Sequence, residues 1–185
     1  MTVWAVARLR NQIQITLKAT SLGFTVTDLT DDSRVLKISN ARQYITKKAI
    51  ENSAANLIPP GSVVLTTRVA VGKVGLTTQP IATNQDCTSF IPRKGLYSEF
   101  LAVWLLANRD LIKSLSRGIG IMGVRRIDLE NLDIPLPPIS EQKKIVAYLD
   151  ALSQKYQELQ KLQEETAADI FTLKQSVLTQ AFKQN

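Results

Sequence analysis

Two groups of basic residues are the parts of the sequence best suited to bind a charged ligand. The first lies in a stretch without an acidic residue and contains Arg34, Lys37, Arg42, Lys47 and Lys48, beside Asn40, Gln43 and Tyr44. The second flanks a glycine-rich loop and contains Lys113, Arg117, Arg125 and Arg126. Such groups neutralise phosphates, and such loops can follow a nucleic-acid groove. The alternative is that each group is an ordinary solvated surface.

The net charge of the chain is unevenly distributed. The formal charge is +7, and residues 1–139 hold all of the excess, since residues 140–185 contain six basic and six acidic side chains. A domain with this surplus attracts polyanions, of which nucleic acid is the commonest in a cytosol. A charge that serves only solubility is the alternative.

Residues that could perform catalysis are scarce. The sequence has no histidine, no glycine loop followed by Lys-Ser/Thr, and no cluster with metal-ligand spacing. Its single cysteine, Cys87, is expected to be a small packed residue, because no histidine is present to activate it. The sequence therefore predicts a protein that is not an enzyme and holds no cofactor or metal. With no signal-peptide pattern and no membrane-length apolar run, a soluble cytoplasmic protein is expected.

Residues 1–138 have the pattern of a mixed α/β domain. Short β-branched runs predict strands over Arg34–Ile38, Ser62–Thr67 and Thr88–Ile91. Residues 61–76 predict two strands joined by a tight connection near Gly72. Apolar residues at helical spacing predict one helix from Ser98, its N-cap, to about Leu115. The fold class is therefore α+β.

Residues 139–185 have the pattern of one long helix. Pro135, Pro137 and Pro138 predict an extended entry, and Ser140 is the expected N-cap. From Ser140 to about Lys183 there is neither glycine nor proline. Steps of four and three residues define a seam, eight of whose ten positions are apolar: Ile145, Leu149, Leu152, Tyr156, Leu159, Gln163, Thr166, Ile170, Leu173 and Val177. This spacing predicts a coiled coil that serves dimerisation. A helix lying on its own domain is the alternative.

Four segments resemble the specificity subunits of type I restriction-modification systems. "IPLPPISEQKKIVAYLD" (Ile134–Asp150) resembles the signature that leads into the conserved helix of that family. "GSVVLTTRVAVGKVGL" (Gly61–Leu76) resembles its strand pair, and "ATNQDCTSFIP" (Ala82–Pro92) resembles its Ala-Thr-Asn-Gln segment. "VWAVARL" (Val3–Leu9) resembles the start of a target recognition domain, although Arg10-Asn11 stand where Gly-Asp is more common.

The resemblance implies a fold, a function and partners. Residues 1–138 would be a DNA-binding target recognition domain, and residues 139–185 the conserved helix. The family implies adenine methyltransferase subunits that use S-adenosylmethionine, and restriction subunits that use ATP and Mg. Glu141 and Gln142 match the family signature, and we expect them to organise the helix start or to contact the methyltransferase.

This sequence departs from the family in having one recognition domain and one conserved helix, where a specificity subunit has two of each. The resemblance therefore implies a half-subunit that pairs through antiparallel helices as a homodimer. Two identical halves would recognise a palindromic site made of two half-sites with unread bases between them.

Several polar residues are candidates for contact with DNA. Arg68, which follows Thr67 at a strand end, could bond guanine, or it could pair with a carboxylate. Lys73 is a candidate phosphate contact. Asn84 and Gln85 could bond adenine, although a structural role in the loop is slightly favoured. The full set of DNA-binding candidates is Lys37, Asn40, Arg42, Thr67, Arg68, Lys73, Asn84, Gln85, Arg117, Arg125 and Arg126.

Three other hypotheses compete with the half-subunit. A stand-alone repressor that dimerises through its coiled coil would bind DNA without partners. A coiled-coil scaffold would not bind DNA and would leave the +7 charge unexplained. A fragment that forms one half of a hetero-pair would recognise an asymmetric target.

Overall fold

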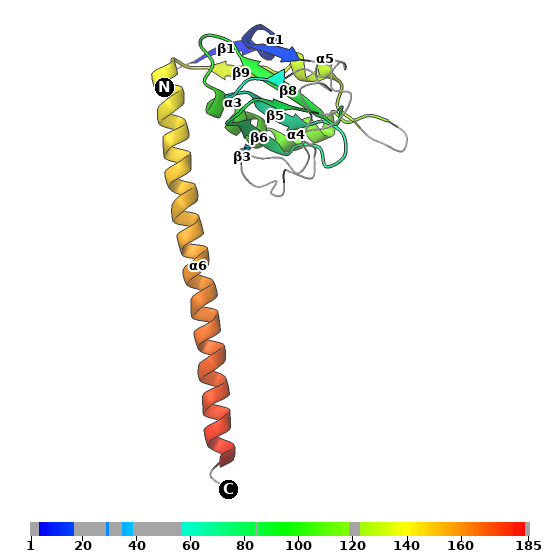
Figure 1. Ribbon diagram of the computed structural model, residues 1–185. Coiled ribbons are helices and arrows are strands. Elements are labelled where there is room, and N and C mark those ends of the chain that lie inside the picture. The colour runs from blue at the N-terminus through cyan, green and yellow to red at the C-terminus, as the bar shows by residue number, and fades with distance from the viewer. Residues whose placement is uncertain are drawn as a thin grey trace. The chain divides into compact units, whose positions relative to one another are not determined.

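The computed structural model describes residues 4–16, 29, 35–38, 57–83, 85–118 and 123–183. The chain divides into two compact units, Met1–Lys143 and Lys144–Asn185. The elements, most of them labelled in Figure 1, are β1 (Ala5–Arg8), α1 (Leu9–Gln12), β2 (Ile13–Thr16), β3 (Leu36–Ile38), β4 (Leu57–Ile58), β5 (Val63–Thr66), β6 (Val74–Thr77), β7 (Ile81–Ala82), β8 (Cys87–Pro92), α3 (Ser98–Ala107), α4 (Arg109–Ser114), α5 (Arg126–Glu130), β9 (Asp133–Leu136) and α6 (Ile139–Lys183). The predicted α+β fold is confirmed.

A five-stranded sheet forms the centre of the first unit. Its strand order is β2-β8-β5-β6-β3, with β3 parallel to β6 and the other neighbours antiparallel. The predicted strands at residues 62–67 and 88–91 are confirmed as β5 and β8, and β3 covers the last three residues of the run that ends at Ile38. β5 and β6 are antiparallel as expected, but seven residues join them, because Thr67–Lys73 form a structured loop rather than a tight turn.

One part of the core of the first unit lies between this sheet and α3, and another is a cluster without α3 residues, formed by Leu29, Ile38, Ile58, Val64, Ile81 and Cys87. All four residues of β5 and all four of β6 are buried, as expected for strands covered on both faces. Phe90 of β8 and Leu101 and Leu105 of α3 complete this core at 0% exposure. Gly75 is required by close approach, since a Cβ there would lie 2.5 Å from the Ile38 side chain.

The expected helix from Ser98 to Leu115 is two helices, so this prediction was wrong in one respect. α3 ends at Asn108, whose backbone N–H and side-chain Nδ2 both donate to the Trp104 carbonyl, at 3.1 and 2.8 Å. A short amide side chain competes with helical backbone bonds in this way and interrupts the helix. Ser98 is also not the cap, because Tyr97 holds the N-cap position and makes no side-chain cap bond.

β9 provides the predicted extended entry to α6. It pairs antiparallel with β1 in a two-stranded sheet, so Pro135 stands in a strand where its missing N–H is tolerated. α6 then begins at Ile139, and the Pro138 carbonyl accepts the N–H groups of Glu141 and Gln142 at 2.9 and 3.0 Å. Ser140 therefore lies inside the first turn, and its prediction as the N-cap was wrong.

Gln142 holds the first turn of α6 to the loop before α3. Its side chain is 0% exposed, and its Nε2 donates to the carbonyls of Gly95 and Pro137 at 2.9 and 2.8 Å. Its Oε1 accepts the backbone N–H of Tyr97 at 2.8 Å. The expectation that this residue organises the helix start is confirmed, because its side chain is buried and makes three hydrogen bonds to the backbone around the start of α6.

α6 confirms the expected single helix, and it spans 45 residues. The described seam residues from Leu152 onwards are exposed, at 51–67% for the apolar ones: Leu152, Tyr156, Leu159, Ile170, Leu173 and Val177. Ile145 and Leu149 are partly buried. A row of exposed leucine, isoleucine and valine side chains along one helix marks a surface suited to association.

Candidate nucleic-acid interface

Three loop segments meet around Thr67, at the end of β5. The N–H groups of Thr67 and Arg68 both donate to the Asp86 carbonyl, at 2.8 and 3.2 Å. The N–H of Val124 donates to the Thr67 carbonyl at 2.8 Å. We name the resulting surface the three-loop surface and define it by its described residues, which are 67–73, 85–86, 117–118 and 123–126.

The loop between β5 and β6 has a well-defined conformation. The Thr66 hydroxyl donates to the Ala70 carbonyl at 2.6 Å and accepts the Lys73 N–H at 2.9 Å. The Gly72 N–H donates to the Thr66 carbonyl at 3.0 Å. Ala70 takes a φ of 57°, in a region that residues with a side chain seldom occupy. These bonds present Arg68, Val69 and Ala70 to solvent, and all three are exposed.

Thr67 itself lies under this surface, so it supports the surface and is not a contact residue. It is buried, and its hydroxyl lies 3.2 Å from the Thr88 hydroxyl and 3.3 Å from the Asp86 carbonyl. Its prediction as a DNA-binding residue is therefore reduced to a positioning role. Threonine in place of a purely apolar residue satisfies the buried backbone at a point where three segments cross.

Arg68 is an exposed cation of the three-loop surface. Its aliphatic stem passes Gly123, where an added Cβ would lie 3.2 Å from the arginine Cγ. Among the residues that the structure describes, no acidic group lies within ion-pair distance of its guanidinium. An exposed guanidinium with this freedom can form two parallel bonds to a guanine or to a phosphate.

Two further cations on α4 flank the same loop. A Cβ on Gly72 would lie 2.5 Å from the Arg109 Cγ and 3.4 Å from the Lys113 Cε, so both side chains reach the loop. Lys113 belongs to a predicted basic group, whereas Arg109 was not predicted to be functional. Their separation of four residues, which places them on one helix face, is the signal that could have indicated Arg109.

The basic group after α4 is brought to this surface, but it is not uniformly available. Arg117 is exposed, and its backbone forms two bonds with Gly123 at 2.9 and 3.0 Å. Arg125 makes two bonds to the Asp128 carboxylate, at 2.9 and 3.0 Å, and Arg126 makes one to Glu130 at 2.6 Å. Asp128 and Glu130 lie just after the stretch without acidic residues, so two of the four cations of this basic group are neutralised by acids of α5.

The Arg125–Asp128 pair remains charged on both sides. The hydrogen bond from Arg125 lowers the pKa of Asp128, and the positive charges of Arg125 and Arg117 lower it further. The same hydrogen bond raises the pKa of Arg125. Since the two charges cancel, this pair attracts a phosphate less strongly than the exposed Arg117 does.

The remaining predicted residues are distributed as follows. Lys73 is partly committed, because its Nζ donates to the Leu29 carbonyl at 2.6 Å and keeps two further hydrogens. Gln85 is exposed in the turn before β8, beside Asp86. Lys37 is exposed on β3, and no contact among the described residues joins it to the three-loop surface. Asn40, Arg42 and Asn84 lie outside the described residues, as do Arg34, Lys47 and Lys48.

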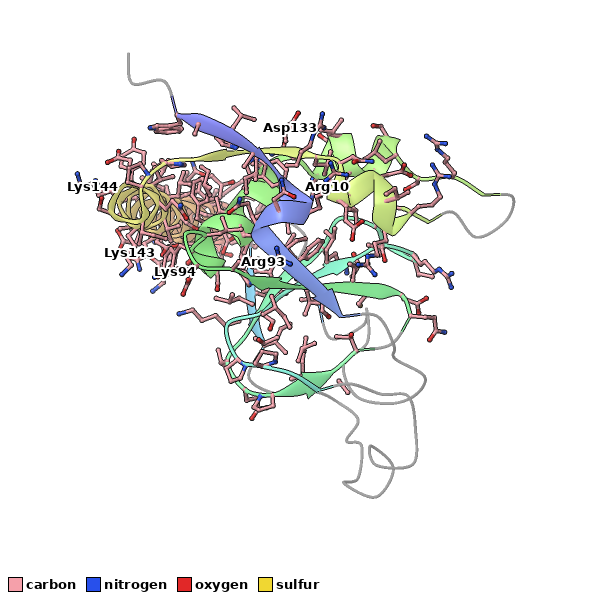
Figure 2. All side chains as sticks on the ribbon, turned by 90° about the horizontal axis from the view of Figure 1, so that it is seen from above. Arg10, Arg93, Lys94, Asp133, Lys143 and Lys144 are labelled. Carbon is pink, nitrogen blue, oxygen red and sulfur yellow. The ribbon has the colours of Figure 1, made fainter. Side chains whose placement is uncertain are left out.

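A second basic group lies away from the three-loop surface and was not predicted. Figure 2 labels its members Arg10, Arg93, Lys94 and Lys143, which come from α1, the loop after β8 and the first turn of α6. Arg93 donates to the Asn11 carbonyl at 3.4 Å, and the Lys143 Nζ lies 5.6 Å from the Tyr97 ring centroid. These four residues come from three separate segments, so the sequence contains no long basic run that could have indicated them.

The part of the chain that the structure describes shows no cluster of three or more residues able to hold a metal ion. Within the same part, no helix has the length and apolar character that crossing a membrane requires.

Comparison with solved structures supports this architecture. A chain from work on the "complex assembly and conformational transition of the type I R-M system" has a TM-score of 0.72 and 26% identity, covering 97% of this chain and 46% of its own. The HsdS subunit from Thermoanaerobacter tengcongensis has a TM-score of 0.66 at 23% identity, over 87% of this chain and 40% of its own. The second likeness is one of fold alone.

Sequence comparison leads to the same group of proteins. The specificity subunit of the type I restriction enzyme MjaIX from Methanocaldococcus jannaschii is 29% identical over 72% of this chain and 32% of its own length. That of EcoR124I/EcoR124II from Escherichia coli is 28% identical over 61% and 30%. This chain thus spans about a third of the curated relatives. The model of the type I restriction modification DNA specificity domain matches residues 22–167. This chain therefore belongs to the type I restriction-modification DNA specificity family.

Proposed function

We propose that residues 1–138 recognise a DNA sequence, as the non-catalytic target recognition domain of a type I restriction-modification enzyme. The observation that carries this proposal is the three-loop surface, where a fixed loop exposes Arg68 beside Gly123, the backbone partner of Arg117, and where two cations of α4 approach the same loop at Gly72. Phosphate contacts by the outer cations would position the domain, and the central side chains would contact base edges. Arg68, Gln85 and Arg117 are the predicted residues best placed for this task.

Residues 139–185 are proposed to pair with a second helix of the same kind. The support is the row of exposed apolar side chains from Leu152 to Val177, which two helices could bury against each other. The second helix could belong to a second copy of this chain. It could also belong to a second recognition half, because this chain spans only about a third of its curated relatives.

The two sources of the second helix predict different targets. Two copies of one chain obey two-fold symmetry, so the target would consist of two inverted identical half-sites. A different second half would give an asymmetric bipartite target. In both cases the paired helices would set the number of unread bases between the half-sites.

Partners and cofactors follow from the family. Methyltransferase subunits would supply adenine methylation with S-adenosylmethionine, and restriction subunits would use ATP and Mg for cleavage. A stand-alone repressor that binds DNA without these partners receives no support from the comparisons, all of which lead to restriction-modification proteins.

Co-expression with the methyltransferase subunit of the source genome tests this proposal. Single-molecule sequencing would locate methylated adenines in the host DNA, with the methyltransferase expressed alone as the control. A bipartite methylated motif that requires this chain is the expected result, and a palindromic motif would identify two-fold pairing. If both proteins are soluble and associated and no motif appears, the recognition function is wrong.

A further inference from the structure

Val69 is a large apolar side chain at the tip of the loop between β5 and β6. It is 60% exposed, and it lies between exposed Arg68 and exposed Ala70. Single exposed apolar residues are common on proteins and carry no meaning by themselves. Two further observations indicate that Val69 has a functional role: the fixed conformation of its loop and the positive charges around it.

The loop is held in the conformation that exposes Val69. The Thr66 hydroxyl bonds both Ala70 and Lys73, and the Arg68 N–H is bonded to the Asp86 carbonyl. Ala70 adopts a φ of 57°, which is energetically unfavourable for a residue with a Cβ. Strain that is maintained by surrounding bonds is characteristic of functional sites. The valine is therefore presented to solvent by a fixed backbone.

The surroundings of Val69 define what it can contact. Arg68 precedes it, and Arg109 and Lys113 reach the base of the same loop beside Gly72. Exposed cations next to a loop can contact the phosphates that border a DNA groove, so that the loop tip can enter the groove. In the major groove the one apolar group on a base edge is the 5-methyl group of thymine.

We propose that Val69 contacts the 5-methyl group of a thymine in the major groove of the target and selects an A·T pair at that position. This inference rests on the proposed DNA-recognition function and names one contact within it. Arg68 and Val69 are adjacent on one fixed loop, so the thymine would lie in the same half-site as the base or phosphate that Arg68 bonds.

The test removes, in separate experiments, the 5-methyl group of thymine from the DNA and the two side-chain methyl groups of Val69 from the protein. Once the methylated motif is known, each thymine of one half-site is replaced in turn by deoxyuridine, which lacks only that methyl group. Competition binding then measures the affinity of the complex with methyltransferase for each duplex. For wild-type protein, one uridine position is expected to weaken binding about four-fold, the value of one buried methyl-sized group. With Val69→Ala, that same position is expected to lose its effect, to within about two-fold.

Ile127→Ala is the matched control. Ile127 is a half-exposed apolar residue of the same domain, 49% exposed on α5, and its substitution should leave the uridine effect unchanged. Equal uridine effects in wild type and Val69→Ala would overturn the inference, as would a half-site without an A·T pair. Both results would leave the DNA-recognition function standing, because a motif would still be methylated. The absence of any methylated motif would instead reject the proposed function itself.

Discussion

The two units of the chain differ in how far they bury their own apolar side chains. In the first unit, β5 and β6 are wholly buried, and each described buried polar side-chain atom has a hydrogen-bond partner. In α6, leucine, isoleucine and valine side chains remain more than half exposed along the seam. The first unit therefore contains the interactions that fold it, whereas the helix leaves a row of apolar side chains uncovered, which under the proposed function a second helix would bury. Substitutions in each unit should separate these two kinds of dependence.

The largest expected effect is the loss of helix pairing after Leu173→Asp. Each leucine removed from a seam forfeits about 1.5–3 kcal/mol of burial, and two-fold pairing would lose it twice while burying two carboxylates. Analytical ultracentrifugation should show pairing abolished, with the near-UV spectrum of the first unit unchanged. Gln175→Asp, on the face of the helix opposite the seam, is the control and should pair normally. If Leu173→Asp pairs as well as wild type, the seam is not the pairing surface.

The next effect belongs to the first unit and comes from Gln142→Ala. This change leaves the carbonyls of Gly95 and Pro137 and the N–H of Tyr97 without their partner. Each buried polar group left unpaired costs about 1–3 kcal/mol, so the free energy of unfolding should fall by about 3 kcal/mol or more. Urea unfolding measures it, with exposed Gln154→Ala as the control, expected to change by less than about 0.5 kcal/mol. A loss below about 1 kcal/mol for Gln142→Ala would contradict this account.

A smaller effect, on DNA binding rather than on folding or pairing, is expected for Arg68 of the three-loop surface and for Lys113 of α4 beside it. Arg68→Ala should weaken binding to the methylated target by about 1–3 kcal/mol and relax selection at one base pair. Lys113→Ala should weaken target and unrelated DNA alike and reduce the slope of log affinity against log salt by about one. Filter binding at several salt concentrations compares the two variants. Identical behaviour of both would mean that Arg68 contacts only the backbone.

The smallest effect is a pH dependence in α5. Because Arg125 lowers the pKa of Asp128 in the folded chain, their pair stabilises the fold above the ordinary carboxyl pKa of 3.8. This stability is lost as the pH falls below 3.8 and through the folded pKa. The Asp128→Asn variant should therefore melt below wild type at neutral pH, and the difference should shrink at about pH 3. The pair is largely exposed on its arginine side, so the difference is modest. A difference that grows in acid would contradict the assignment.

Sequence patterns predicted the parts of the fold that depend on regular spacing. The long helix after Pro138 and the buried strands β5 and β8 follow from period and composition. The break at Asn108 was missed because the apolar residues on both sides keep one helical spacing, with Leu105 and Ile112 both buried. Its cause is a side-chain bond to the Trp104 carbonyl, which periodicity does not encode.

The site was predicted in part, for similar reasons. Arg68, Gln85 and Arg117 were predicted from residue type and neighbouring turns, and the structure brings their segments together around Thr67, while their contact with DNA stays a prediction. Lys73, Arg125 and Arg126 are less available for phosphates than their residue types suggest, because each has a hydrogen-bond partner in the folded chain. The Lys73 bond joins residues far apart in the sequence, and the two arginine bonds depend on where α5 begins. Arg109 was missed since its approach to Gly72 joins residues 37 positions apart.

The pairing of β1 with β9 brings the two ends of the first unit together, with Ala5 opposite Leu136. A unit whose first and last strands are hydrogen-bonded neighbours can be cut from one chain and inserted into another through a single junction. Exchange of this unit by recombination would replace the whole three-loop surface in one genetic step, while the helix seam would stay unaltered.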